Sequence, residues 1–199
     1  MKESIKWIII ALLLAGIILC AYFGYSLLTK DRASGSLVID APSEDSTDEK
    51  ENGEGSPSAS KNSAPDFVVY NKDGKAVRLS DFKGTPVIIN FWATWCPYCI
   101  MEMPDLEAAC KAYGDRIQFM IINVTDGYEE TLSSAKAFAE EYKYDFPVYY
   151  DTSLSATSAY SAYSLPRTFF IDADGNLDSH WVGMITPDIL QQGIDRLLK

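Results

Sequence analysis

Two cysteines separated by two residues form the pattern in this sequence that is best suited to chemistry. The apolar run Pro86–Trp92 predicts a buried strand, and Pro97–Tyr113 predicts a helix with proline in its first turn. Cys96 lies between the two, and Cys99 lies in the first turn of the predicted helix. The unpaired N–H groups and the dipole at a helix N-terminus stabilise an anion such as a thiolate. We therefore expect Cys96 to be the reactive thiol and Cys99, one turn deeper, to close a disulfide with it.

Other uses of a Cys-x-x-Cys pair have to be weighed. Such a pair can be half of a zinc site, but the only further cysteine and histidine in the globular part are Cys110 and His180, far apart in the sequence. The sequence therefore predicts no metal site. A structural disulfide in a non-catalytic binding module tethered to the membrane stays open as an alternative, and it predicts that Cys96→Ser leaves function intact.

The chain divides into three regions by composition. Residues 1–28 contain the uncharged apolar run Trp7–Leu28, which as a helix of about 33 Å would cross a bilayer. We expect an uncleaved membrane anchor, with cleavage or lipidation at Cys20 as the alternatives. Residues 29–64 hold eight acidic and four basic residues and no aromatic residue, which predicts a disordered acidic tether. Residues 65–199 have the composition of one globular domain.

The order of expected elements in residues 65–199 indicates the fold class. An N-terminal β-hairpin precedes alternating strands and helices, and a second hairpin and a helix close the domain, which predicts a three-layer α/β sandwich around a mixed sheet. The expected strands are Phe67–Tyr70, Ala76–Leu79, Pro86–Trp92, Arg116–Val124, Pro147–Tyr150, Arg167–Ile171 and Leu177–Val182, and the expected helices are Pro97–Tyr113, Glu130–Tyr142, Ser153–Tyr163 and Pro187–Leu198.

The charge of the chain excludes one class of partner. The formal net charge is -11, and no basic stripe interrupts the acidic surface. A protein without such a stripe cannot neutralise a phosphate backbone, so nucleic acid is not expected as a partner.

In combination, several motifs resemble the thioredoxin-like domains of the TlpA/ResA class, which are extracytoplasmic thiol–disulfide oxidoreductases of bacteria. The resemblance covers the whole globular part and implies a thioredoxin-like fold, a membrane anchor, and a redox-active disulfide with no other cofactor. The matching segments are Pro65–Phe67, Leu79–Gly84, Pro86–Cys96, Glu102–Pro104, Leu165–Pro166 and Asp174–Gly175.

The resemblance also implies a substrate-binding set around the cysteines. Pro166 matches the cis-proline that faces the disulfide in this fold, and Leu165 before it would offer a backbone edge to a substrate strand. Trp95, Pro97 and Tyr98 would form the rim. The dipeptide between the cysteines is the one typical of glutaredoxins, which leaves the reduction potential open.

A carboxylate is expected to complete the catalytic set. Glu102 matches an acidic residue of the family near the active site, and three residues beyond Cys99 on a helix it would lie on the same side, one turn away. From there it could relay the proton of the thiol. Asn90 matches the position at which ordinary thioredoxins keep a buried aspartate, and an amide cannot take over that proton.

The expected function is the reduction of disulfides in exported proteins. Family resemblance implies apocytochrome c or extracellular repair enzymes as substrates, and an integral membrane electron carrier as the source of electrons. A disulfide-forming oxidase of the same fold is the first alternative. A thiol peroxidase is another, although Ile89 and Ala93 stand where the Pro-x-x-x-Thr-x-x-Cys pattern of those enzymes needs proline and threonine.

Overall fold

The computed structural model describes residues 62–199 together with the backbone of residues 38–39. These residues form one mixed sheet in the strand order β1-β8-β7-β4-β5-β6-β2-β3, in which β4, β5 and β6 are parallel. The strands are β1 Val38–Ile39, β2 Val68–Asn71, β3 Ala76–Arg78, β4 Val87–Trp92, β5 Gln118–Asn123, β6 Val148–Tyr150, β7 Arg167–Ile171 and β8 Leu177–Val182, and the helices are η1 Leu79–Phe82, α2 Pro97–Tyr113, α3 Leu132–Tyr142, α4 Ser155–Ala159 and α5 Pro187–Leu197.

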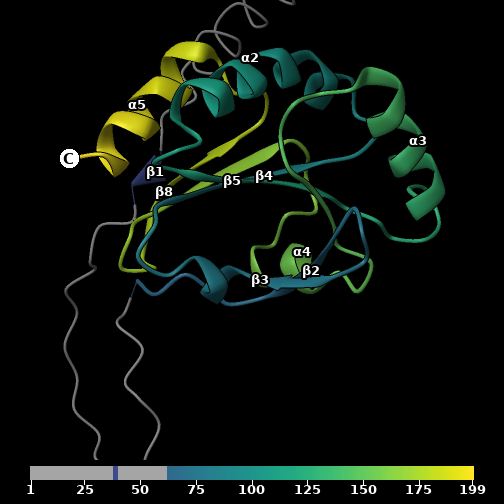
Figure 1. The fold of residues 1–199 in the computed structure, drawn as a ribbon, viewed down its shortest axis with the longest axis horizontal. Coiled ribbons are helices and arrows are strands. Elements are labelled where there is room, and N and C mark those ends of the chain that lie inside the picture. The colour runs from purple at the N-terminus through teal and green to yellow at the C-terminus, as the bar shows by residue number, and fades with distance from the viewer. Residues whose placement is uncertain (1–37, 40–61) are drawn as a thin grey trace, which may run out of the picture. The chain divides into compact units, whose positions relative to one another are not determined.

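Helices cover both faces of the sheet (Figure 1), which confirms the predicted layers. Helices α2 and α5 pack on one face, where side chains of β4 such as Ile88 and Trp92 meet Leu106 and Ile194. The opposite face of β4, with Ile89, packs against α4 and η1. Because successive side chains of a strand point to opposite faces, all six residues of β4 are buried between the two layers. This places the strand that leads to Cys96 at the centre of the domain.

Helix α2 has the predicted bounds and α5 ends one residue before its predicted end, at Leu197, whereas two other helices differ more from the prediction. Helix α3 begins at Leu132 because the Thr131 side chain caps it, which leaves Glu130 outside the helix. Helix α4 covers only Ser155–Ala159 because the backbone takes a positive φ on each side of it, at Leu154 and Ser161. The prediction of one helix over 153–163 was therefore wrong at both ends.

The start of the domain is fixed by backbone hydrogen bonds to the β7–β8 turn. The N–H of Ala64 donates to the carbonyl of Gly175, and the N–H of Leu177 donates to the carbonyl of Asn62. Further upstream, β1 pairs antiparallel with β8, with Val38 opposite His180. The remainder of the predicted tether lies outside the described residues.

The predicted membrane anchor also falls outside the part of the chain that the structure describes. Within residues 38–39 and 62–199, no helix combines the length and the apolar character needed to cross a bilayer. The segment Trp7–Leu28 is not among these residues, so its role stays a prediction.

Candidate active site

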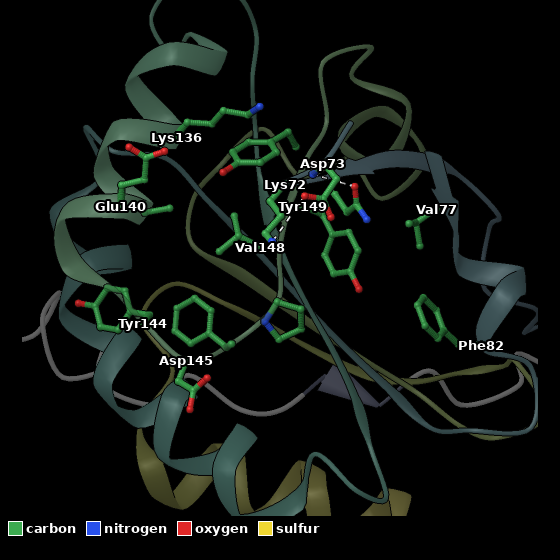
Figure 2. A pocket seen from close by; sticks show the side chains of 15 residues that line it. Lys72, Asp73, Val77, Phe82, Lys136, Glu140, Tyr144, Asp145, Val148 and Tyr149 are labelled. Atoms are coloured by element: carbon green, nitrogen blue, oxygen red, sulfur yellow. Dashed lines mark hydrogen bonds and ion pairs between the residues drawn. The ribbon is translucent and has the colours of Figure 1, made fainter. Parts of the chain in front are cut away.

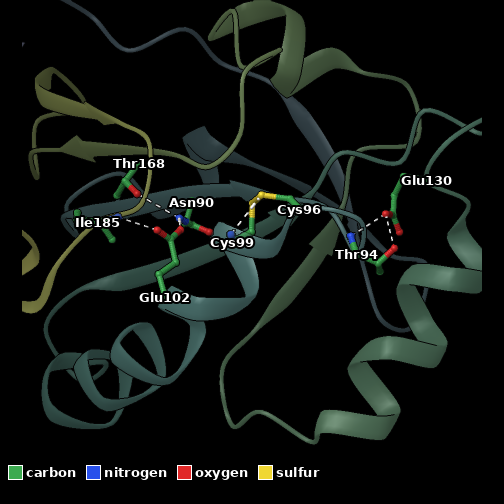
Figure 3. The surroundings of a disulfide bond; sticks show 8 residues. All are labelled: Asn90, Thr94, Cys96, Cys99, Glu102, Glu130, Thr168 and Ile185. Carbon is green, nitrogen blue, oxygen red and sulfur yellow. Dashed lines mark hydrogen bonds between the residues drawn. A yellow bond between two sulfur atoms is a disulfide. The ribbon is translucent and has the colours of Figure 1, made fainter. Parts of the chain in front are cut away.

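The two cysteines lie where β4 passes into α2, and they form a disulfide (Figure 3) with Cα atoms 5.3 Å apart. Cys96 is the N-cap of α2 and Pro97 stands in its first turn, as the sequence predicts. The N–H of Cys99 donates to Sγ of Cys96 at 3.2 Å, so a helix N-terminal N–H group points at the sulfur that would carry the thiolate. Both cysteines are buried, and Cys96, 4% exposed, is the more accessible residue compared with Cys99 at 1%.

A buried glutamate holds the loop that leads to Cys96. The N–H and the hydroxyl of Thr94 both donate to one carboxylate oxygen of Glu130, each at 2.7 Å (Figure 3). Ser134 donates to the other oxygen at 3.3 Å. The Glu130 side chain is fully buried. Sequence analysis missed this residue because it assigned Glu130 to the start of a helix, and nothing local indicates a partner 36 positions away.

We predict that Glu130→Ala destabilises the fold and displaces the loop. Hydrogen bonds to a charged group contribute about 1.5–3 kcal/mol each, so the loss of two, with the Thr94 N–H left unpaired, should lower the free energy of unfolding by roughly 3–6 kcal/mol. Denaturant unfolding and a disulfide-reduction assay measure the effect, and we expect activity to fall about tenfold or more as Cys96 moves. The exposed neighbour Glu129 supplies the control, and an equal loss in Glu129→Ala would contradict the role of Glu130.

Glu102 lies on the buried side of α2, one turn from Cys99 as predicted, and both side chains are buried. One carboxylate oxygen accepts from the Asn90 side-chain amide and the other from the backbone N–H of Ile185, both at 2.7 Å (Figure 3). Burial raises the pKa of Glu102 to about 7, although these two hydrogen bonds lower it. A group with this pKa can both accept and return a proton near neutral pH.

Two members of the hydrogen-bond network around this carboxylate had no signal in the sequence. Ile185 contributes only its backbone N–H, from the loop after β8. Thr168 lies opposite Asn90 in the β4–β7 pair and accepts a second hydrogen bond from the Asn90 amide at 3.1 Å. Both contacts join residues that are 78 or more positions apart, which spacing in the sequence does not reveal.

The raised pKa of Glu102 predicts a pH dependence of stability. Its ordinary value is 4.5, and the folded value is about 7. Between these pH values the unfolded chain releases the proton and the folded protein keeps it, so the free energy of unfolding should fall with rising pH, by about 3 kcal/mol in total above pH 7. Denaturant titrations of the disulfide form across this range measure the effect. The slope should flatten in Glu102→Gln, and an unchanged slope in that variant would contradict the assignment.

Pro166 lies at the end of the sheet where β4 leads to the cysteines. Its peptide bond to Leu165 is cis. The following residue, Arg167, pairs with Phe91 of β4, so Pro166 is level with the end of that strand. Pro166 is buried and Leu165 partly exposed. The assignment of these two residues to substrate binding stays a prediction.

The predicted rim residues are exposed next to the disulfide. Trp95 is 51% exposed and Tyr98 59%, and Pro97 is exposed between the cysteines. Other exposed apolar side chains come from loops and helix turns that adjoin the site residues in the sequence, and the prediction did not include them: Met101, Tyr128, Tyr163 and Met184.

Neither remaining candidate ligand joins the site. Cys110 is a free, partly exposed cysteine two turns beyond Glu102 on α2, and burial raises the pKa of its thiol. The ring of His180 stacks on Phe169 with centroids 5.5 Å apart. Across the described ranges, no three His, Cys, Asp or Glu side chains gather as metal ligands would.

A large open cavity of about 700 Å³ lies elsewhere in the domain (Figure 2). Helix α3, the β2–β3 turn and β6 form it, with Tyr144, Tyr149, Lys72 and Asp73 among the lining residues. None of the predicted site residues lines it. Chemistry therefore centres on the disulfide, where the reactive groups meet, and not on this cavity.

Comparison with known proteins places the chain among thioredoxin-like proteins. A model of the AhpC/TSA family matches residues 61–180. The thioredoxin-like protein YneN of Bacillus subtilis is 35% identical over 132 residues, which are 66% of this chain and 76% of that protein. The thiol-disulfide oxidoreductase ResA of Bacillus cereus is 33% identical over 135 residues, 67% of this chain and 76% of that one.

Solved structures of the same fold agree. A putative thiol:disulfide interchange protein DsbE from Chlorobium tepidum has a TM-score of 0.62 and 28% identity, and the match covers 69% of this chain and 96% of that one. The exposed lipoprotein thioredoxin Etrx1 of Streptococcus pneumoniae has a TM-score of 0.61 and 31% identity, covering 67% of this chain and all of that one.

Proposed function

The chain belongs to the AhpC/TSA family, and from this premise we propose that it reduces disulfides of exported proteins from a position outside the cytoplasm. It is a thiol–disulfide oxidoreductase whose redox group is the cysteine pair itself. The observation that carries the proposed direction is the buried carboxylate of Glu102, one turn from Cys99. A negative charge there disfavours a thiolate on the pair, whereas a strong oxidant of this fold depends on a stabilised reduced form.

The geometry supports a two-step exchange. In the first step the Cys96 thiolate attacks one sulfur of a substrate disulfide, forming a mixed disulfide and releasing one substrate thiolate. In the second step Glu102 takes the proton of the Cys99 thiol, and the resulting thiolate attacks Sγ of Cys96. The second substrate thiolate leaves, so the substrate has gained two electrons and the Cys96–Cys99 disulfide has formed. A membrane electron carrier would return the pair to the dithiol.

The exposed apolar side chains around the disulfide indicate the kind of substrate. Trp95, Tyr98 and Met101 on the α2 side, with Tyr163 near Pro166, offer aromatic and thioether surface to a polypeptide. We propose that Leu165 pairs with an extended substrate segment while these side chains contact its flanks. The substrates that the family resemblance implies, and that we propose here, are apocytochrome c and extracellular repair enzymes.

The proposed location rests on the N-terminal region of the sequence. We propose that residues 1–28 anchor the chain in the membrane and that residues 29–64 give the domain its reach. Etrx1 of Streptococcus pneumoniae is described as an exposed lipoprotein, so a lipid on Cys20 stays the alternative form of anchor.

Two other activities are less well supported. A thiol peroxidase of this family would need a proline and a threonine ahead of its reactive cysteine, and this chain has Ile89 and Ala93, both buried in or just after β4. A disulfide-forming oxidase would share the fold and the cysteines, and the direction of electron flow separates it from a reductase.

The thiol state of the pair in the native cell tests the proposed direction. Cells are quenched with acid, free thiols are alkylated with a mass tag, and the tags on Cys96 and Cys99 are counted. A reductase fed by a membrane carrier should be held mostly as the dithiol. A pair held mostly as the disulfide would contradict the proposal and favour the oxidase.

A further inference from the structure

The side chain of Asn90 has a buried acceptor that no donor satisfies in the disulfide form. Asn90 is 1% exposed, and its Nδ2 donates to Glu102 at 2.7 Å and to Thr168 at 3.1 Å. Its Oδ1 has no hydrogen-bond partner among the residues described here. A buried carbonyl oxygen that has lost its water and found no donor destabilises the state in which it occurs.

The orientation of this amide follows from its neighbour. An ionised carboxylate only accepts hydrogen bonds, and the second oxygen of Glu102 is already bonded to the N–H of Ile185. In the structure the Asn90 nitrogen faces Glu102, which is the arrangement that an ionised carboxylate requires, and the oxygen points away from Glu102. Figure 3 shows this oxygen directed toward Cys99.

The fold explains why one amide lies between these two side chains. Asn90 lies on the same face of β4 as Ile88 and Trp92, the face that packs against α2. Cys99 and Glu102 are one turn apart on the buried side of α2, directly over that face. The amide nitrogen of Asn90 therefore bonds to Glu102, and its oxygen points toward Cys99 (Figure 3).

Reduction of the disulfide changes the hydrogen-bonding capacity of the Cys99 sulfur. A disulfide sulfur carries no proton and cannot satisfy an acceptor, whereas the thiol of Cys99 is a donor. We propose that Asn90 Oδ1 accepts a hydrogen bond from the Cys99 thiol in the dithiol form only, so that this amide helps to set the reduction potential of the pair. This inference rests on redox cycling of Cys96 and Cys99 and holds whether the chain acts as a reductase or as an oxidase.

The expected shift has a definite sign. The amide stabilises the dithiol through the new hydrogen bond and destabilises the disulfide through the unsatisfied oxygen, and both effects raise the potential. Asn90→Leu removes both at similar volume, so the equilibrium with glutathione should move about tenfold toward the disulfide, which for two electrons is about 30 mV more negative.

Equilibration of the full chain in glutathione buffers measures this shift. Thr168→Val is the control, since it removes a partner of Nδ2 but leaves Oδ1 in place, and it should change the equilibrium less than twofold. A shift in Asn90→Leu below twofold, or an equal shift in Thr168→Val, would overturn the inference.

Repeating the Asn90 substitution in a Glu102→Gln variant separates the effect of Asn90 Oδ1 on Cys99 from the effect of the amide on Glu102. In Glu102→Gln the carboxylate is gone, so Asn90 can no longer act through the charge of Glu102. Asn90→Leu added to this variant should still shift the equilibrium about tenfold if Oδ1 acts on Cys99. A shift that disappears in this background would mean that Asn90 acts only by positioning Glu102, and the inference would fail.

The thiol itself offers a test that needs no replacement of Asn90. In the infrared spectrum of the reduced protein, the S–H band lost in Cys99→Ser should lie at the lower frequency of a hydrogen-bonded thiol. A band at the frequency of a free thiol would overturn the inference. The proposed function would survive that result as long as the same preparation reduces a disulfide substrate.

Discussion

Replacing Cys99 with serine should stop turnover and leave the protein covalently attached to its substrate. Cys96 lies at the helix N-terminus, where an N–H group points at its sulfur, and it keeps its ability to attack a disulfide. Without the second thiol the mixed disulfide has no internal route to resolution, so multiple-turnover reduction should fall by on the order of 10³-fold or more. Non-reducing electrophoresis and mass spectrometry should detect a one-to-one adduct that dithiothreitol releases.

The companion variants decide which cysteine attacks. Cys96→Ser should neither turn over nor form an adduct, and Cys110→Ala should behave as wild type because this thiol lies elsewhere on α2. An adduct that forms with Cys96→Ser and not with Cys99→Ser would reverse the two roles. Unchanged activity in Cys96→Ser would make the pair a structural link and the domain a binding module.

The second large effect is expected at Glu102, whose replacement by glutamine should slow the resolution step by about 10²-fold. General-base catalysis contributes on the order of 10²–10⁴-fold, and glutamine cannot accept the proton of Cys99. The rate of the wild-type protein should rise with pH and level off above a pKa of about 7, because only the ionised carboxylate is a base. Rapid-quench measurement of mixed-disulfide decay against pH separates this step from the first attack.

Replacing Asp105, further along α2, changes the pKa of Glu102 but keeps the carboxylate that accepts the proton. Asp105 raises the pKa of Glu102 slightly through its charge, so Asp105→Asn should move the pH profile to lower values and leave the maximum rate nearly unchanged. If Glu102→Gln keeps both the wild-type rate and the wild-type pH profile, Glu102 is not the proton acceptor.

Local signals in the sequence were sufficient to predict the framework of the site. The bounds of α2, β7 and β8 match the prediction because proline, an apolar run or a turn marks each end. The cysteine pair was identifiable for the same reason, since its chemistry depends on a local spacing at a strand–helix junction. Glu102 could be predicted only as lying on the same side of the helix as Cys99, and its burial became visible with the sheet in place.

The parts that could not be predicted are contacts between segments far apart in the chain. Glu130 reads as an ordinary helix-forming residue, and only the folded arrangement brings it to Thr94. The N–H of Ile185 has no side-chain identity to detect. The free oxygen of Asn90 depends on which neighbours occupy its nitrogen. Each of these contacts depends on the packing of distant segments, which one sequence does not contain.

The reduction potential of the Cys96–Cys99 pair in the full chain, equilibrated in defined thiol–disulfide buffers, tests the proposed reductase most directly. We predict a value near or below about -230 mV, which allows a membrane carrier to keep the pair as a dithiol able to reduce exported proteins. A value of about -150 mV or above would contradict the account and make the chain an oxidase or isomerase of the same fold.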